Sequence, residues 1–374
     1  MNRFRKKFGE SSLSTDFPTA IVAILLSIYG IIMVASAVRG GDSSYVTKQA
    51  FGTFLGICFM FILSNINYEY LLNTKLSITI FASSVFLLVL TLFIGFGSGN
   101  QNWISLKGLS LNIQPSEFVK LFFIMTFAKH LDSVKTNINH IKNIALLLLH
   151  AGIIIGLVML QGDLGSALIF ICIAATMCFV QGMSVWYFLG GGTLVLLAAP
   201  YLWQFLKPYQ QQRILVGFNP ELDPLGYGYQ QILSKNAIMN GGIMGTGYMD
   251  STVSPTIPYN HTDMIFSVLT EELGLFGVLA LLILLVILVA RIIKTAFMAR
   301  KNIGSVICAG VAAMLIAQTI ENIGMTLGLL PIIGITLPFM SYGGSSVLSI
   351  YMSLGIVMSV YRFRGKYFFE REPS

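Results

Sequence analysis

Charge is scarce in this sequence. Asp, Glu, Lys and Arg make up 10% of its 374 residues, while 55% of the residues are hydrophobic. Ordinary soluble domains carry about 25% charged residues, so this chain cannot cover a water-exposed exterior along its whole length. Disorder is excluded as well, because disordered chains combine low hydrophobicity with high net charge. The composition therefore predicts an integral membrane protein.

Cysteine is also rare, and no Cys-x-x-Cys pair occurs. All the cysteines stand within apolar runs, so neither a disulfide framework nor a zinc site is expected. They are Cys58, Cys172, Cys178 and Cys308. Basic residues outnumber acidic ones by 23 to 16, but a membrane protein gathers such an excess beside its spans. We therefore attribute the net positive charge to the orientation of the chain in the membrane, and we expect no nucleic-acid partner.

Long apolar runs, by contrast, fill the sequence. A helix that crosses a bilayer needs about 20 mostly apolar residues, because its backbone must satisfy its own hydrogen bonds in lipid. Ten such windows predict an all-α polytopic membrane protein with one long extracytoplasmic loop between the seventh and eighth helices. The windows are 17–38, 46–64, 76–96, 115–131, 143–160, 165–182, 184–203, 264–290, 304–330 and 343–361.

Lys and Arg gather beside alternate loops. They occur within 3–7, at Lys75, and within 129–142, 291–301 and 362–371. Basic residues mark the cytoplasmic side, so both termini are expected in the cytoplasm, which requires an even number of spans. A cleavable signal peptide ending at the Ala-Ser-Ala of 35–37 is the competing explanation of the first window, whose length of about 20 apolar residues favours a span.

The sequence is expected to form a single membrane domain over residues 1–374. Repeats of the kind that build many transporters are not evident. The one long segment between windows, residues 204–262, is rich in Gly, Pro, Tyr and Asn and falls on the outer side in this orientation. A loop of that length between tightly connected helices is typical of a functional segment.

Most of the unusual polar sequence falls on the same outer side, in segments 97–120, 161–166, 213–266 and 337–346. Several ionisable residues enter the predicted spans. Such residues are costly in lipid and are functional candidates by default. They are Glu117, Lys120, Asp163, Glu271, Glu272 and Glu321.

The polar segments contain a series of short motifs: NWI at 102–104, QPSEFVK at 114–120, QGDLGS at 161–166, NPELDPLGYGYQ at 219–230, HTDMIF at 261–266, EELG at 271–274, ENIGM at 321–325 and PFMSYGGSS at 338–346. With these motifs in this order, the chain resembles the SEDS family (shape, elongation, division and sporulation) of membrane glycosyltransferases. The resemblance covers essentially the whole chain. Within the family, NPELDPLGYGYQ and ENIGM make the chain look more like the elongation subgroup, RodA, than the division subgroup, FtsW.

The resemblance implies that the substrate is lipid II, an undecaprenyl-pyrophosphoryl disaccharide pentapeptide. It implies processive β-1,4 polymerisation at the outer face of the plasma membrane during cell elongation. A class B penicillin-binding protein, which is a transpeptidase, is the implied partner, together with the nascent glycan strand and membrane lipids.

The resemblance also maps the family's catalytic aspartate onto Asp263 of the HTD motif. Inverting displacement of an anomeric pyrophosphate needs a base on the attacking 4-hydroxyl. An ionised Asp near a helix N-terminus suits that role. Helix capping by Thr262 and Asp263 is the alternative explanation of the same residues.

A pyrophosphate leaving group requires cations nearby. Lys120 and Arg213 are our candidates, Arg213 because its planar fork can bind phosphate oxygens through two hydrogen bonds. A salt bridge with Glu117 at i,i+3 is the alternative for Lys120, and Glu117 is itself a substrate-site candidate. A divalent cation, Mg²⁺ or Mn²⁺, stays open as a cofactor, although no metal-ligand spacing is visible. The basic residues on the outer side are Arg39, Lys48, Lys107, Lys120, Lys207, Arg213 and Lys235.

Three further substrate-site candidates have competing structural explanations. Trp103 can stack on a sugar or anchor its loop at the interface, and Asn102 precedes it where the family usually has Arg. Asp163 stands in a Gly-Asp-Leu-Gly turn, where Asp is ordinary. Glu271 lies nearer than Glu272 to the helical face of Asp263, which favours it as a cavity residue.

Three further substrate-site candidates, and one pair of polar residues within a predicted span, remain. His261 belongs to the HTD motif. Ser345 and Ser346 end a Gly-Gly-Ser-Ser stretch that can cradle phosphate with backbone amides or simply begin a helix. The Glu321-Asn322 pair is expected to form a hydrogen bond between helices.

Two other functions fit the composition. A flippase or transporter of lipid-linked cell-wall precursors would also have many spans and buried carboxylates. A scaffold that recruits the transpeptidase would need no chemistry of its own. The polar groups gather at the outer face and not at the bilayer midplane, where transporters bind substrate, and this placement favours the glycosyltransferase.

Overall fold

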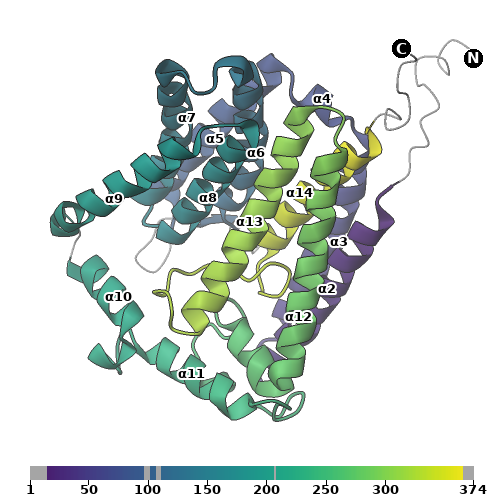
Figure 1. The fold of residues 1–374 in the computed structure, drawn as a ribbon. Helices are drawn as coiled ribbons and strands as arrows, with labels where there is room; N and C mark the ends of the chain where they lie inside the picture. Colours follow the sequence, from purple (N-terminus) through teal and green to yellow (C-terminus); the bar gives the residue numbers. More distant parts are fainter. Residues whose placement is uncertain (1–14, 97–101, 107–110, 206–207, 365–374) are drawn as a thin grey trace, which may run out of the picture.

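The computed structural model describes residues 15–96, 102–106, 111–205 and 208–364, and helices dominate it (Figure 1). Lys107 and Lys207 lie outside the described residues. The first half contains α2 (Phe17–Ala37), α3 (Ser44–Asn65), α4 (Tyr68–Leu71), α5 (Thr74–Ile94), α6 (Pro115–Ser133), η1 (Lys135–Asn137), α7 (Ile141–Leu160) and α8 (Leu164–Gln181). The second half contains α9 (Val185–Phe205), α10 (Pro208–Phe218), η2 (Pro220–Leu222), α11 (Tyr229–Gly241), η3 (Ser254–Thr256), α12 (Ile265–Met298), α13 (Asn302–Thr326) and α14 (Gly344–Arg362).

A helix stands at each of the ten predicted windows. Within the described residues, eight of these helices are long and apolar enough to cross a membrane. The other two are α6, which carries Glu117 and Lys120, and α9, whose apolar stretch runs only over Val185–Tyr201. The prediction of an all-α polytopic membrane protein is confirmed, and α6 stands apart because polar residues take up part of its length.

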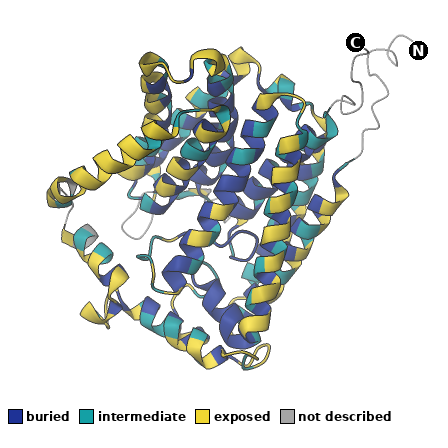
Figure 2. Cartoon of the chain, in the orientation of Figure 1, coloured by how far each residue is buried: buried dark blue, intermediate teal, exposed yellow. Residues whose placement is uncertain are grey.

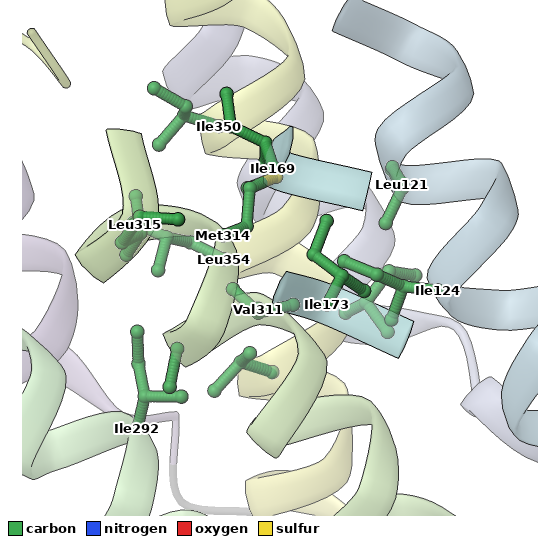
Figure 3. Packing of buried hydrophobic residues seen from close by; sticks show 14 of the residues in the cluster. Leu121, Ile124, Ile169, Ile173, Ile292, Val311, Met314, Leu315, Ile350 and Leu354 are labelled. Atoms are coloured by element: carbon green, nitrogen blue, oxygen red, sulfur yellow. The ribbon is translucent and has the colours of Figure 1, made fainter. Parts of the chain in front are cut away.

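The core of the bundle surrounds α13 and α14. Their apolar windows are 72% and 78% buried, whereas those of α3 and α5 are 22% buried (Figure 2). In Figure 3, Ile124 of α6 and Ile173 of α8 pack beside Val311 of α13. A helix that is apolar all round is either buried or covered by lipid, so the exposed apolar faces of the outer helices are the expected lipid-facing surface.

Close packing also includes α2. A Cβ atom at Gly30 would lie 2.1 Å from the Phe339 carbonyl oxygen, so only glycine lets this helix approach the segment that precedes α14. At the N-terminal end of α2, the Asp16 carboxylate accepts from the Thr19 hydroxyl at 2.6 Å and forms an ion pair with Arg291. Arg362, at the end of α14, donates to the Thr15 hydroxyl at 3.4 Å. Two arginines, Arg291 and Arg362, therefore lie at the same end of the bundle.

The predicted helix at 264–290 is longer than expected and interrupted. Gly274 has a φ of 59°, a left-handed conformation that breaks α12. The segment between α11 and η3 fills the break: Thr246 N–H donates to the Glu271 carbonyl at 2.9 Å, and Leu275 N–H donates to the Ile243 carbonyl at 3.0 Å. Backbone groups freed inside a membrane must find such partners.

Two outer segments contain structure that the sequence did not predict. The segment 204–262, expected as a loop, holds α10 and α11 along one edge of the molecule (Figure 1). The segment before α6 forms an antiparallel hairpin of β1 (Ile104–Leu106) and β2 (Leu111–Ile113), in which Ile104 pairs with Ile113. Both segments form walls of the cavity described next.

Candidate functional site

A cavity of about 940 Å³ opens at the end of the bundle where α3, α6 and α14 begin and where the turn before α12 lies. The hairpin, α10, the start of α11 and the segment 332–336 also form parts of its wall. This is the end opposite Arg291 and Arg362, because α14 starts at the cavity and ends at Arg362. Within the described residues, the charged side chains lining the cavity are Lys48, Arg213 and Asp263.

Asp263 lies in the turn that precedes α12. Its backbone is held firmly: Asn322 donates from its amide to the Asp263 carbonyl at 2.8 Å and to the Ile335 carbonyl at 2.7 Å. At the preceding residue, the Ser341 hydroxyl donates to the Thr262 carbonyl at 2.6 Å. Its half-buried carboxylate, however, accepts no hydrogen bond from the described part of the chain. The site thus fixes the residue while leaving the carboxylate free.

The capping explanation of Asp263 is wrong for this structure. Met264 occupies the N-cap position of α12, and no side chain makes a capping hydrogen bond there. The Thr262 hydroxyl donates instead to the Tyr259 carbonyl at 3.1 Å. The expectation for Glu321-Asn322 also changes, because Asn322 bonds these two loop carbonyls, and Glu321 keeps a buried carboxylate oxygen with no partner among the described residues.

The surroundings of Asp263 favour its neutral form. Burial, and then the negative charge of Asp163, raise the pKa of Asp263 to about 6. A carboxylate whose pKa lies near the ambient pH is a stronger proton acceptor than an ordinary Asp and still ionises at neutral pH. Asp263 therefore has the properties of a general base.

Two cations flank the cavity, and each lies over a tyrosine ring. The Arg213 guanidinium of α10 is 5.8 Å from the centre of the Tyr227 ring. The Lys48 ammonium of α3 is 5.9 Å from the centre of the Tyr45 ring. Arg213 was a sequence candidate, whereas Lys48 was not chosen from the outer basic residues. No signal in its local sequence singled it out, because the cavity forms only when α3 meets distant segments.

The N-terminus of α14 also faces the cavity. Gly343, Gly344 and Ser345 line it, and the N-terminus of a helix offers free backbone N–H groups to an anion. The Ser345 hydroxyl accepts from the Gln114 N–H at 3.3 Å. Ser346 lies outside the lining and shares a hydrogen bond of 3.0 Å with Thr336.

Lys120 and Glu117 are not part of the cavity lining. The Lys120 ammonium donates to the Glu117 carboxylate at 2.8 Å, with both side chains buried. The second carboxylate oxygen of Glu117 accepts from the Ser349 hydroxyl at 3.3 Å. The i,i+3 salt bridge considered for the sequence is present, and it ties α6 to α14.

Glu271 corrects a sequence expectation. It was predicted to face the same cavity as Asp263, yet it does not line it. Its carboxylate accepts from the backbone N–H groups of Val253 at 2.8 Å and Ser254 at 2.6 Å and from the Asn240 amide at 2.8 Å. Glu271 therefore holds the loop before η3 against α12.

Of the other residues predicted from the sequence, one lines the cavity and two lie behind its lining. Trp103 lines the cavity and pairs with Phe96 through backbone hydrogen bonds of 2.9 and 3.2 Å. His261 lies behind the wall, 4.7 Å from the Tyr45 ring centre to centre, and burial lowers the pKa of its imidazole. Asp163 is buried beside the cavity as the N-cap of α8.

Within the described ranges, no three His, Cys, Asp or Glu side chains gather as a metal site. The divalent cation considered for the leaving group stays a prediction. The cationic groups that this structure does bring to the cavity are the side chains of Lys48 and Arg213.

Comparison with known proteins identifies the relatives of this chain. Stage V sporulation protein E of Bacillus subtilis is 36% identical over 365 residues, covering 94% of this chain and 98% of that protein. Peptidoglycan glycosyltransferase MrdB of Escherichia coli is 35% identical over 358 residues, covering 93% and 94%. A probable peptidoglycan glycosyltransferase FtsW of a Geobacter species is 32% identical over 363 residues, covering 94% and 98%.

Solved structures agree with these relatives. A chain from a peptidoglycan synthase complex that coordinates polymerization and crosslinking superposes with a TM-score of 0.83 at 31% identity, covering 94% of this chain and 99% of that one. The rod shape determining protein RodA of Thermus thermophilus gives a TM-score of 0.71 at 27% identity, with 94% and 98% covered. A family model described as a cell cycle protein of the FtsW, RodA and SpoVE type matches residues 17–366. The chain belongs to this FtsW/RodA/SpoVE family, the SEDS family of multi-pass membrane proteins.

Proposed function

We propose that this protein is a peptidoglycan glycosyltransferase that polymerises lipid II into β-1,4-linked glycan strands. The observation that carries the proposal is the unpaired, half-buried Asp263 carboxylate in a cavity of about 940 Å³ that also holds Lys48 and Arg213. A base and two cations are the groups that displacement of a lipid pyrophosphate by a sugar hydroxyl requires. The names of relatives such as MrdB support the same reaction.

The proposed step is an inverting displacement. Asp263 accepts the proton of the 4-hydroxyl of the acceptor sugar as that oxygen attacks the anomeric carbon of the donor. The bond from this carbon to the pyrophosphate oxygen breaks, and the lipid pyrophosphate leaves with the electron pair. Arg213, Lys48 and the N–H groups that begin α14 stabilise the leaving anion. One α bond is lost and one β bond is formed.

The orientation of the chain is part of the proposal. The cavity and the basic end, where Asp16 pairs with Arg291, are separated by the length of α14, which is about 28 Å for 19 residues at 1.5 Å each. The positive-inside rule places the basic end, and with it both termini, in the cytoplasm. The cavity then opens at the outer face of the plasma membrane, where lipid II is used.

The elongation role and the partner belong to the proposal too. The sporulation, division and MrdB relatives lie between 32% and 36% identity, so the motifs NPELDPLGYGYQ and ENIGM remain the support for elongation. A class B penicillin-binding protein is the proposed partner, supported by the likeness to a chain of a synthase complex.

Purified protein incubated with fluorescent lipid II tests the function. The expected product is a ladder of glycan chains that forms in the presence of a β-lactam, because transpeptidation is not needed for polymerisation. Redistribution of labelled lipid across a vesicle bilayer without polymer would contradict the proposal and favour a flippase. A titration of Mg²⁺ and Mn²⁺ against a chelator in the same assay decides whether a divalent cation takes part.

A further inference from the structure

Asp163 supports the cavity wall from behind. Its side chain is buried, and as the N-cap of α8 it accepts from the Ser166 N–H at 3.0 Å and from the Ser166 hydroxyl at 2.8 Å. Capping explains why an Asp stands at this turn. It does not explain two further hydrogen bonds that reach the same carboxylate from the cavity wall.

These two bonds come from amide side chains that line the cavity. Gln114, just before α6, donates from Nε2 to Asp163 Oδ2 at 3.1 Å. Asn102, just before β1, donates from Nδ2 to the same oxygen at 3.4 Å. One buried carboxylate thus joins the hairpin, α6 and α8 beside the cavity.

The chemistry of a carboxylate fixes how both amides are turned. An ionised carboxylate can only accept hydrogen bonds, whereas an amide has a donating nitrogen and an accepting oxygen. Asp163 therefore keeps each NH₂ group toward itself and each amide oxygen away. Within the described part of the chain, neither Asn102 Oδ1 nor Gln114 Oε1 accepts a hydrogen bond. Two acceptor oxygens are left for a ligand in the cavity.

We propose that Asp163 is a positioning residue for sugar recognition: it turns Asn102 and Gln114 so that their oxygens accept from the hydroxyl or acetamido N–H groups of a substrate sugar. This inference rests on the proposed function. It adds to that function a part of the cavity wall where two amide oxygens accept hydrogen bonds. The sugar, not the pyrophosphate, is the part of the substrate that this wall recognises, because sugars carry the donors that amide oxygens need.

The charge of Asp163 has a second effect on the same site. It contributes, after burial, to the raised pKa of Asp263. Loss of that charge therefore lowers the pKa of Asp263 and extends activity to lower pH. The other ionisable groups around the cavity stay the same when Asp163 alone is changed; they are Lys48 and Tyr45 of α3, Glu117 and Lys120 of α6, Arg213 of α10, Tyr227, Tyr229, Tyr259, His261, Glu321 of α13 and Tyr342.

The variant Asp163→Asn tests both effects, because Asn keeps the size and the capping ability of Asp. Its own NH₂ group can now face the two amides, so they are free to turn. We expect the KM for lipid II to rise about tenfold, the loss expected for one or two hydrogen bonds, with kcat at mildly alkaline pH close to that of the wild type. The acid limb of the rate profile should move to lower pH by about one unit.

Two comparison variants separate the effects. Gln114→Leu removes one acceptor and no charge, so it should raise KM while leaving the acid limb in place. Asp16→Asn changes another buried capping Asp, at the opposite end of the bundle, and should lower thermal stability without moving KM or the acid limb. If Asp163→Asn does not fold, Gln114→Leu and Asn102→Leu carry the test, because both leave the cap of α8 intact.

The inference would be overturned if the wild type is active and the Asp163→Asn variant has the same KM for lipid II and the same acid limb of the rate profile. Unchanged KM in both leucine variants would overturn it as well. Absence of glycan polymer from the wild type is a different result, since it would contradict the proposed function itself.

Discussion

Lys120 lies 2.8 Å from Glu117 on the same face of α6, and both side chains are shut away from the cavity. The two charged residues that the sequence places in this helix therefore bind each other. Glu117 also accepts a hydrogen bond from Ser349 of α14, so the pair joins α6 to α14. Within the part of the chain that the structure describes, the cations that line the cavity are then Arg213 of α10 and Lys48 of α3.

Breaking the buried pair should destabilise the protein. Lys120→Met leaves the Glu117 carboxylate buried and unpaired, which costs about 3–5 kcal/mol in comparable sites. The double variant Lys120→Met, Glu117→Gln should recover most of that loss, because no isolated charge remains. Thermal unfolding in detergent micelles measures both. A Lys120→Met protein as stable as the wild type but unable to bind lipid II would show that Lys120 is a substrate ligand.

The rate of polymerisation should depend on pH through Asp263. Its pKa is raised to about 6, and only the ionised carboxylate can accept a proton. The rate is therefore expected to fall as pH drops through about 6 and to be nearly constant at mildly alkaline pH. A profile of kcat/KM against pH gives the apparent value for the free enzyme. An acid limb near the ordinary pKa of Asp, about 4, would contradict this assignment.

Removing either cavity cation should impair the reaction. Arg213→Gln and Lys48→Gln each lose a charged donor, which corresponds to at least about tenfold in kcat/KM for charge-assisted hydrogen bonds. Lys235→Gln is the matched control, since Lys235 of α11 is an outer basic residue that does not line the cavity. Equal activity in Lys48→Gln and Lys235→Gln would remove Lys48 from the site.

Glu271 should matter for stability and not for the chemical step. Glu271→Ala leaves the Val253 and Ser254 N–H groups without their acceptor, at about 1–3 kcal/mol for each buried group. The kcat of the folded fraction should stay near that of the wild type. Denaturation and active-fraction measurements together decide this, and a stable but inactive Glu271→Ala protein would return Glu271 to the reaction.

The apolar pattern of the sequence predicted the membrane helices, whereas Asp263 was selected through the resemblance of its HTD motif to the SEDS family. Apolar length alone located all ten helical windows, since the bilayer sets the length of a span. The break at Gly274 was not predictable, because it depends on the segment 242–247 reaching into α12. Neither were α10 and α11, which lie in a stretch dominated by Gly, Pro, Tyr and Asn.

The site residues show the same limit. The helical-face argument for Glu271 failed because α12 begins at Ile265, so the 100° rotation per residue does not extend back to Asp263 in the preceding turn. Lys48 was missed because many of its neighbours in the cavity come from α10, the turn before α12, the segment 332–336 and the start of α14, all far along the chain. A single sequence does not show which distant segments come into contact, so residues that join the site only through such contacts could not be predicted.

The central claim is that the free Asp263 carboxylate is the base of a lipid II polymerase. Asp263→Asn keeps the shape of the side chain and removes its ability to accept a proton at neutral pH. Asp250→Asn, an exposed outer-loop carboxylate away from the cavity, is the control. With equal membrane insertion and thermal stability, the account predicts glycan ladders from the wild type and Asp250→Asn and none from Asp263→Asn. Undiminished polymerisation by Asp263→Asn would contradict it.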